Sequence, residues 1–381
     1  MKILHLFSNS KWTGPAEPAL NLCLALREAG AAADFACAPG SDETVNKIVE
    51  TARDRGLEPV LRFRLAKHYH PLWNFLDSRS LAAYLRVHPY DLVHCHLDND
   101  HRIAQKVCRA SGIPLVRSSY YGEGFPQAHR YVRLLAGADL TIEPSRIAKE
   151  HDQRRFHVPD ERLAVIPVGI DTERFDPKRE VPDARRWLRI PPDAFVVGIV
   201  ARMQRHRKFE DFFAAMRSLI NTCTNAHVIV VGRGTRQKQV GFEPARRLGI
   251  EDRVHFAGYV DGENYVGMLK AFDVQVMLVP GSDGTCRAVR EAMAMAKPVV
   301  AARRGMLPEL VQHEVTGLLC DGSPQDLCKC LIGLARDRQL AHALGRAARA
   351  AAEEGLSLDT QARSVLSKYE EVLGLVGRGT R

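Results

Sequence analysis

Two carboxylate side chains, Asp283 and Glu291, stand eight positions apart where the sequence changes from strand-like to helix-like. The apolar residues 274–279 have the composition of a strand, and Pro280 with the glycines after it ends that strand. Residues from about Thr285 onward favour a helix. We therefore expect Asp283 in a loop and Glu291 about two turns into the helix, roughly 10 Å further along its axis.

This spacing suits a nucleotide sugar. The first turn of a helix presents unpaired backbone N–H groups and a partial positive charge, which together favour a phosphate. A carboxylate on each side would accept hydrogen bonds from hydroxyl groups. We expect Glu291 to hold a ribose, Asp283 a sugar, and the loop between them, with Gly284, Thr285 and Cys286, a diphosphate. A surface helix with solvated carboxylates fits the same spacing, because such pairs are common by chance.

A basic loop is predicted directly after a strand at residues 195–201. Its basic side chains are Arg202, Arg205, His206, Arg207 and Lys208. In open α/β sheets the carboxyl ends of the strands face the ligand crevice, so these cations would lie beside a ligand. A departing diphosphate gains negative charge, which fixed cations stabilise. A solvated surface loop is the alternative interpretation.

A turn with two glycines, Gly232-Arg-Gly234, follows the next predicted strand. It fits a tight turn near a ligand, although so short a pattern is weak by itself. Neither half of the chain carries the G-x-G-x-x-G pattern of dinucleotide-binding folds. That absence argues against an NAD-dependent oxidoreductase.

Histidines and aspartates cluster where another predicted strand, residues 90–97, gives way to a loop. The members are His94, His96, Asp98, Asp100 and His101. His94 and His96 share one face of the strand, because strand residues alternate between faces, and imidazoles on one face can bind a metal ion. The other three belong to the following loop and helix, so we expect no metal site. We instead place His96 in the ligand crevice and assign the others to packing or capping.

The composition indicates a globular protein that interacts with anions. The chain has 381 residues, 45% hydrophobic and 26% charged, with a net charge of +9. This balance favours phosphates and anionic lipid head groups, and we expect no nucleic-acid partner because no recognition motif is present. The nine cysteines form no C-x-x-C pair, which fits a reducing interior. No apolar run approaches the ~20 residues that span a bilayer, so any membrane contact would be peripheral.

Strand-like and helix-like segments alternate along the chain, which predicts parallel, doubly wound α/β sheets. We expect two Rossmann-like domains in series, at residues 1–169 and 183–356. Residues 170–182, rich in Pro, Asp and Arg, would link them. Residues 357–381 would form a helix that crosses back to the first domain.

One segment, residues 62–75, is irregular and mixes basic with aromatic side chains. It could line an acceptor site or touch anionic lipid. We interpret it as an ordinary solvated loop with aromatic anchors.

Together these segments resemble the retaining, nucleotide-sugar-dependent glycosyltransferases of family 4, whose GT-B fold has two Rossmann-like domains facing a cleft. The resemblance runs along nearly the whole chain, and it implies that residues 1–169 form an acceptor-side domain and residues 183–356 a nucleotide-sugar-binding domain. Val200-Ala-Arg202 with Arg207 resembles the family pattern G-R-x-x-x-x-K, and residues 280–294 resemble P-S-x-x-E-x7-E-A-M-A. Other matching parts are residues 166–175, 298–301, 308–311 and 316–319, Gly14, Asp91-Leu-Val-His94 with His96, and Ala138-Asp139 with Pro144-Ser145.

The resemblance implies transfer of a hexose from a UDP- or GDP-sugar to an acceptor hydroxyl, with retention at the anomeric carbon and without a metal or other cofactor. It assigns Arg202, with Arg207 or Lys208, to the diphosphate, and the leaving phosphate would take the acceptor proton. The implied donor-binding set also contains Gly14, Gly232, Gly284, Thr285, Cys286 and Glu291.

The chain departs from the family pattern at four positions. Asp283 stands where the family usually has Glu, and Cys286 replaces a frequent glycine. Arg207 replaces a lysine, which keeps the charge but not the geometry. Tyr120 falls where many members carry a histidine near the donor sugar, and we expect it with His96 on the acceptor side.

Two other functions fit the same residues. One is a GT-B-fold epimerase acting on a UDP-sugar. The other is a sugar-nucleotide-binding subunit without catalysis, which the changes at Asp283 and Tyr120 would suit. By analogy, a basic enzyme of this family builds cell-envelope glycans such as lipopolysaccharide. We therefore expect a glycan or glycolipid acceptor and a cytoplasmic protein, with peripheral contact to the inner face of the plasma membrane.

Overall fold

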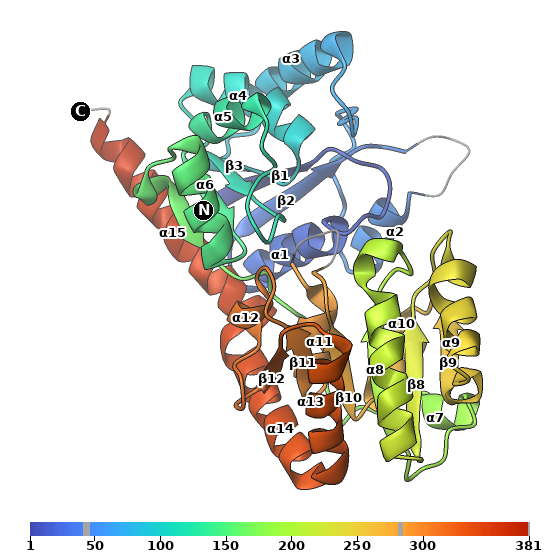
Figure 1. The fold of residues 1–381 in the computed structure, drawn as a ribbon. Coiled ribbons are helices and arrows are strands. Elements are labelled where there is room, and N and C mark those ends of the chain that lie inside the picture. The colour runs from blue at the N-terminus through green and yellow to red at the C-terminus, as the bar shows by residue number, and fades with distance from the viewer. Residues whose placement is uncertain (41–45, 281–284, 380–381) are drawn as a thin grey trace. The chain divides into compact units, whose positions relative to one another are not determined.

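The computed structural model describes residues 1–40, 46–280 and 285–379 of the chain. It contains two compact units (Figure 1), the first mainly residues 1–169 with a last segment that begins at Leu358, and the second mainly residues 170–357. Each unit is built on one six-stranded sheet in which every pair of neighbouring strands is parallel.

The strands of the first sheet follow the order β2-β1-β3-β4-β5-β6. They are β1 (Lys2–Phe7), β2 (Ala32–Cys37), β3 (Leu92–Cys95), β4 (Leu115–Ser118), β5 (Leu140–Glu143) and β6 (Leu163–Val165). The helices of this unit are α1 (Ala16–Glu28), α2 (Lys47–Asp54), α3 (Pro71–Val87), α4 (Asp98–Ser111), α5 (His129–Ala136), α6 (Arg146–Phe156), the short η1 (Asp160–Arg162) and α15 (Leu358–Gly379). The strand order reverses between β1 and β3, which is the topological switch point of this sheet.

The strands of the second sheet follow the order β12-β11-β10-β7-β8-β9. They are β7 (Phe195–Val200), β8 (Ala226–Val231), β9 (Val254–Gly258), β10 (Val274–Met277), β11 (Val299–Ala302) and β12 (Gly317–Cys320). The helices are α7 (Ala184–Trp187), η2 (Arg205–Arg207), α8 (Phe209–Thr222), η3 (Lys238–Phe242), α9 (Glu243–Arg247), η4 (Glu251–Arg253), α10 (Gly262–Ala271), α11 (Arg287–Ala294), α12 (Leu307–Leu310), α13 (Pro324–Arg336) and α14 (Arg338–Gly355). Here the switch point lies between β7 and β10.

Strand sequences explain why both sheets are covered on two faces. Parallel strands buried on both sides read as continuous apolar runs, and β7 is Phe-Val-Val-Gly-Ile-Val. Its side chains alternate between two cores, because Phe195, Val197 and Ile199 belong to one hydrophobic cluster and Val196 to another. The prediction of two doubly wound α/β sheets is therefore confirmed.

The last helix, α15, packs on the first unit. Ala362, Val365 and Tyr369 are fully buried in the same core as Leu20 and Leu26 of α1. The expected C-terminal helix that returns to the first sheet is thus present.

The segment 62–75 is not one irregular loop, so this expectation was wrong. Helix α3 begins at Pro71 and includes Phe75. Proline suits a first helical position, because the N–H that it lacks would be unpaired there. The ring of His70 caps the helix by accepting the Trp73 N–H at 3.4 Å.

Candidate active site

Some of the predicted donor residues follow β7 and β10, at the switch point of the second sheet, whereas Gly14 belongs to the first unit and Gly232 follows β8. The loop after β7 carries Arg202 and Arg207, and the chain after β10 leads into residues 281–284. Arg207 joins the two segments, because its guanidinium donates to the backbone carbonyl oxygens of Val279, at 3.4 Å, and of Pro280. Ligands of open α/β sheets bind outside the strand ends at such a point. The basic loop therefore lies where a ligand is expected.

The three predicted diphosphate cations have different surroundings. Arg202 is exposed, whereas Arg207 is only 7% exposed. Lys208 has a left-handed backbone, with φ 58°, and its ammonium pairs with Asp211 at 3.1 Å. Arg202 is thus the most accessible of the three cations, while Arg207 ties the loop to the end of β10.

Two predicted donor residues, Asp283 and Gly284, lie outside the described residues. Thr285 and Cys286, which follow them, are each 1% exposed. Cys286 is the N-cap of α11 and has a left-handed backbone with φ 51°. This conformation favours glycine, which accounts for the glycine that the family pattern often has there.

Glu291 lies a little over one turn into α11 rather than two, because the helix begins at Arg287. Its side chain is buried, with 2% of the residue exposed. One carboxylate oxygen accepts a hydrogen bond from the Tyr265 hydroxyl of α10, and the other lies 3.4 Å from Nε of Arg287. These two partners orient the carboxylate, and no sequence pattern marks Tyr265 as one of them.

Gly232 is explained by packing at the end of β8. Its φ is +127°, and a Cβ there would meet the carbonyl oxygen of Ala201 at 2.3 Å. Its N–H donates to the Gly258 carbonyl at 2.7 Å. A larger residue would push away the start of the basic loop, so Gly232 positions that loop. Its ligand contact stays a prediction, as does that of Gly14, which is exposed in the turn before α1.

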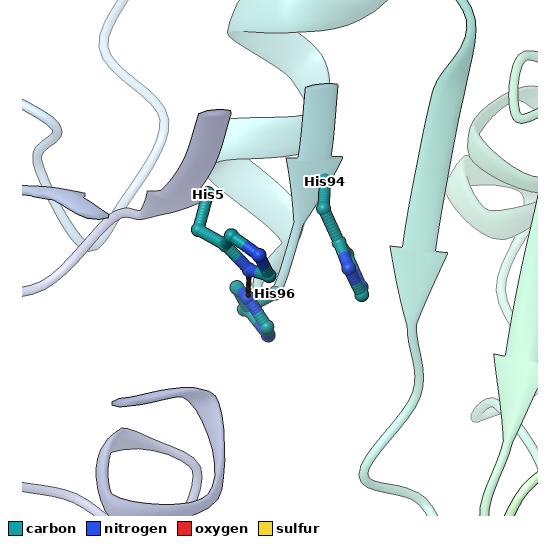
Figure 2. A group of neighbouring side chains, drawn as sticks. All are labelled: His5, His94 and His96. Atoms are coloured by element: carbon teal, nitrogen blue, oxygen red, sulfur yellow. Dashed lines mark hydrogen bonds between the residues drawn. The ribbon is translucent and has the colours of Figure 1, made fainter. Parts of the chain in front are cut away.

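Three buried histidines meet at the switch point of the first sheet (Figure 2). His5 comes from β1, His94 from β3 and His96 from the residue after β3, and each is 0% exposed. Nδ1 of His5 lies 3.0 Å from Nε2 of His96, and Nδ1 of His96 lies 2.7 Å from the Tyr120 hydroxyl oxygen. The two predicted acceptor-side residues are thus in direct contact.

His94 forms the other branch of this cluster. Its Nε2 lies 2.9 Å from the Ser118 hydroxyl oxygen, and its Nδ1 contacts the hydroxyl of Tyr369 in α15. Burial lowers the pKa of His5 to about 3 and holds the pKa values of His94 and His96 well below the ordinary range. All three imidazoles are therefore neutral at pH 7.

The histidines are also the residues of this region that could hold a metal ion. One nitrogen from each of His5, His94 and His96 lies within 4.8 Å of the others. This group differs from the histidine and aspartate cluster predicted from the sequence. It includes His5, whereas Asp100 caps α4. The rings stack at 18° and 14°, so their lone pairs lie in nearly parallel planes rather than converging on one point. These contacts favour a hydrogen-bonded network, and the absence of a metal stays a prediction.

The network also fixes its own proton positions. Nε2 of His5 is buried without a hydrogen-bond partner in the described part of the chain. A buried unpaired N–H costs about 1–3 kcal/mol and is rarer than a buried unpaired acceptor. The favoured tautomer therefore has the proton on Nδ1 of His5, which donates to His96. His96 then donates from Nδ1 to the Tyr120 oxygen, so the Tyr120 hydroxyl can direct its own proton elsewhere.

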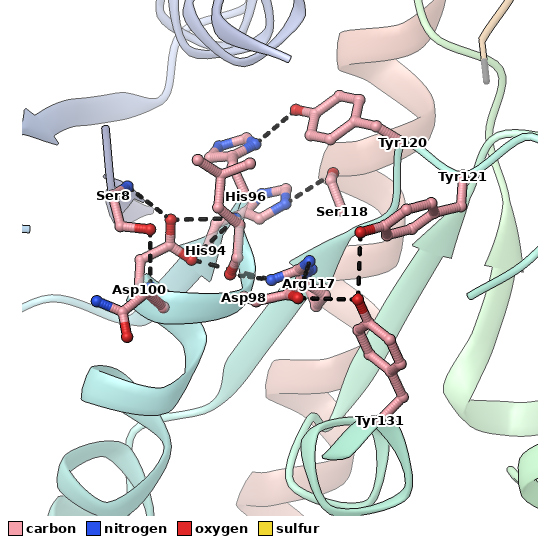
Figure 3. Close-up of polar contacts among 12 residues, drawn as sticks. Ser8, His94, His96, Asp98, Asp100, Arg117, Ser118, Tyr120, Tyr121 and Tyr131 are labelled. Carbon is pink, nitrogen blue, oxygen red and sulfur yellow. Dashed lines mark hydrogen bonds and ion pairs between the residues drawn. The ribbon is translucent and has the colours of Figure 1, made fainter. Parts of the chain in front are cut away.

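A second polar network surrounds Arg117 of β4 (Figure 3). Arg117 is 3% exposed and its Nη2 donates to Oδ1 of Asp98 at 3.0 Å. The other carboxylate oxygen of Asp98, Oδ2, accepts from the Tyr131 hydroxyl at 2.9 Å. Asp100 accepts the backbone N–H groups of Ser8, at 2.8 Å, and of Leu97, at 2.9 Å. Asp98 and Asp100 are thus occupied by this network. An arginine within an apolar strand was the sequence signal that could have revealed it.

Comparisons with known proteins agree with this geometry. The model for "Glycosyl transferases group 1" matches residues 180–351, and the model for "Glycosyltransferase Family 4" matches residues 13–174. A D-inositol 3-phosphate glycosyltransferase of Corynebacterium jeikeium is 33% identical over 343 residues, covering 83% of this chain and 81% of that protein. The chain belongs to glycosyltransferase family 4. The predicted family is confirmed.

Solved structures show the fold of this glycosyltransferase. HepE of Anabaena in complex with UDP has a TM-score of 0.79 at 21% identity, covering 97% of this chain and all of that chain (100%). The lipopolysaccharide outer core galactosyltransferase WaaB in its apo form has a TM-score of 0.71 at 16% identity, with 97% and 100% covered. The predicted GT-B architecture is confirmed. Among the described residues of this glycosyltransferase, no helix is both long and apolar enough to cross a bilayer.

Proposed function

We propose that this glycosyltransferase moves a hexose from a UDP- or GDP-linked sugar to a hydroxyl of a glycan or lipid-linked acceptor, with retention at the anomeric carbon. The observation that carries the proposal is the Arg207 contact between the basic loop and the end of β10, at the switch point of the second sheet. Solved structures of HepE with UDP, with UDP and glucose, and with UDP-glucose support the donor class. WaaB supports a role in lipopolysaccharide or related cell-envelope synthesis.

The donor diphosphate would lie against the basic loop and the start of α11. Arg202 would pair with its oxygens and stabilise the negative charge that grows as the bond to the sugar breaks. Arg207 would add positive charge and hold the loop in place. Asp283 and Gly284 would complete the sugar side. These cations would neutralise the diphosphate, so the proposal includes no metal or other cofactor.

Glu291→Ala is expected to weaken binding of UDP and GDP about tenfold to a hundredfold, because a hydrogen bond to a charged group contributes about 1.5–3 kcal/mol. Titration calorimetry with each nucleotide measures the change. Glu291→Gln keeps an acceptor for the Tyr265 hydroxyl and should lose less affinity for the two nucleotides. Glu251→Ala, at an exposed carboxylate of the same unit, is the matched control. Wild-type affinity in Glu291→Ala would refute the ribose role.

On the acceptor side, the Tyr120 hydroxyl would donate a hydrogen bond to a substrate oxygen. Burial raises the pKa of Tyr120 above its ordinary value, so the group stays protonated. The proton arrangement of His5 and His96 leaves this hydroxyl proton available. The chain would thus supply a neutral donor at the position where the family pattern often has a histidine.

Tyr120→Phe is expected to lower kcat about tenfold or more with little change in the KM for the donor, because it removes one oriented donor and keeps the ring. Steady-state kinetics with a fixed acceptor measure the effect. Tyr121→Phe, which removes a neighbouring hydroxyl that lies 3.2 Å from that of Tyr131, is the control. Equal kcat values for the two variants would remove Tyr120 from the mechanism.

The transfer itself can be tested by incubating the protein with UDP- and GDP-sugars and candidate glycan acceptors, and following the products by NMR. The proposal expects a new glycosidic bond with the anomeric configuration of the donor. An inverted product would contradict retention. Conversion of the donor without any acceptor would identify an epimerase, and binding without turnover would identify a silent subunit.

We also propose that the enzyme works in the cytoplasm and binds the inner face of the plasma membrane peripherally. The net charge of +9 favours anionic lipid, and a lipid-linked acceptor would be presented at that surface.

A further inference from the structure

Helix α3 of the first unit has polar side chains on its buried face. Asn74 and Asp77 are 8% and 5% exposed. The Asn74 amide donates to the Asn99 side chain of α4 at 2.7 Å, and Asp77 accepts the backbone N–H groups of Arg64, at 2.9 Å, and Leu65, at 3.0 Å. These contacts attach the helix to α4 and to the segment before it, and Figure 1 shows α3 beside α4 in the first unit.

The opposite face of the same turns is apolar and exposed. Leu72, Phe75 and Leu76 are 54%, 57% and 43% exposed, and Tyr69, just before the helix, is 60% exposed. Positions 72, 75 and 76 follow the spacing of one helix face. A surface helix in water normally buries apolar side chains and exposes polar ones. The exposed apolar face of α3 therefore suits a less polar environment.

The charge around this apolar face is positive. Residues 59–90 contain five Lys or Arg residues and one acid, Asp77, which is the buried residue described above. Arg64 stacks over the Trp73 ring at 3.6 Å, Arg79 lies 5.8 Å from the Phe75 ring, and Arg102 of α4 lies 5.7 Å from the Tyr69 ring. Cations therefore border the exposed apolar side chains. We call Tyr69, Leu72, Phe75 and Leu76, with Arg64 and Arg79, the α3 surface.

We propose that the α3 surface docks this enzyme on an anionic lipid bilayer, with the apolar side chains among the acyl chains and the arginines at the phosphate groups. Interfacial helices bind by this combination of buried apolar area and charge attraction. The inference rests on the proposed function in one respect: docking would bring the enzyme to a lipid-linked acceptor. Docking itself requires no turnover.

The charge of the surface disfavours a second copy of the chain as its occupant. A two-fold dimer presents the same patch from both subunits, so the cations of each copy would face those of the other. An anionic bilayer offers both the opposite charge and an apolar layer beneath it. An anionic bilayer therefore matches both the arginines and the apolar side chains of the α3 surface.

Cosedimentation of the full chain with vesicles tests the proposal. We expect binding to vesicles that contain phosphatidylglycerol, much weaker binding to pure phosphatidylcholine, and loss of binding at high salt. The double variant Leu72→Asp/Phe75→Asp should bind at least about tenfold more weakly. The double variant Arg64→Glu/Arg79→Glu should lose at least about fivefold in vesicle affinity for each cation removed, and only with the anionic vesicles.

Two control variants make the same chemical changes elsewhere. Trp187→Asp/Tyr259→Asp alters aromatic residues of the second unit that are 57% and 59% exposed. Arg154→Glu/Arg155→Glu reverses two exposed charges on α6 of the first unit. Both should bind vesicles as the wild type does. Melting temperatures, and the thermal shift given by UDP- and GDP-sugars, should match the wild type in all four double variants.

Three results would overturn the proposal: no vesicle binding by the wild type, equal binding by surface and control variants, or a wild-type dimer in ultracentrifugation that Leu72→Asp/Phe75→Asp converts to a monomer. The last result would make the α3 surface a self-interface. Vesicle binding without any sugar-nucleotide shift would reject the proposed function and leave the docking inference standing.

Discussion

Replacing Arg202 by alanine is expected to lower kcat on the order of 10²- to 10³-fold, because one charge-stabilising contact made in the transition state contributes about 3–4 kcal/mol. Arg202 is exposed directly after β7, beside the switch point where the donor diphosphate is proposed to lie. The substitution leaves the packed core unchanged, so the melting temperature should stay close to that of the wild type. Steady-state kinetics at saturating donor measure the effect.

Two further variants sharpen this result. Arg202→Lys keeps the charge but loses the planar, two-pronged donor geometry, so its kcat should fall between those of the wild type and Arg202→Ala. Arg247→Ala removes an exposed arginine of α9 in the same unit and should leave kcat nearly unchanged. Wild-type turnover in Arg202→Ala would remove this residue from the mechanism.

Mild acid is expected to destabilise the first unit through its buried histidines. An unfolded imidazole has a pKa of about 6.5, whereas burial lowers the pKa of His5 to about 3 and those of His94 and His96 well below the ordinary value. Below pH 6.5 the unfolded state therefore binds more protons than the folded state. Stability is complete above that pH and is lost as the pH falls toward the folded pKa values.

Each buried neutral histidine lowers the free energy of unfolding by up to about 1.4 kcal/mol per pH unit below 6.5, and His101, whose pKa burial also holds well below its ordinary value, is a fourth such group. Asp100 and Glu143 act in the opposite direction, because burial raises their carboxyl pKa values and the folded state binds those protons more readily. Domains have only about 5–15 kcal/mol of stability. Urea unfolding at pH 7 and at pH 5.5 measures the loss.

A variant series separates the buried histidines from the rest of the chain. His96→Gln should make the loss of stability per pH unit smaller by up to about 1.4 kcal/mol, since one buried titrating imidazole is gone. His129→Gln, at an exposed histidine of α5, should leave it unchanged. The same pH dependence in His96→Gln as in the wild type would contradict the account of the neutral network.

The two sheets could be predicted because their strands are continuous apolar runs separated by helical segments, as in β7. Because the strands could be predicted, the residues that follow them could be placed at the strand ends. Arg202 does follow β7 and His96 does follow β3. Hydrophobic periodicity predicts the strands, and their parallel arrangement places all the carboxyl ends at one edge of the sheet. It therefore located the region of the candidate site.

The partners of these residues could not be predicted, because they depend on which strands become neighbours. His5 meets His96 across 91 positions only because β1 pairs with β3. The Tyr265 hydroxyl of α10 meets Glu291 of α11 across 26 positions, which no local pattern predicts. Residues 62–75 were misread because mixed basic and aromatic residues suggest a solvated loop, whereas Pro71 in fact begins a helix whose first buried side chains, Asn74 and Asp77, are polar.

Titration of the wild type and of Arg202→Ala with UDP-, GDP- and ADP-sugars tests the central claim most directly. The account predicts that the wild type binds at least one UDP- or GDP-sugar, and that Arg202→Ala binds the same ligand more weakly while keeping its fold. Failure of the wild type to bind any of these sugars, or equal affinity in the variant, would contradict a donor site at the switch point between β7 and β10.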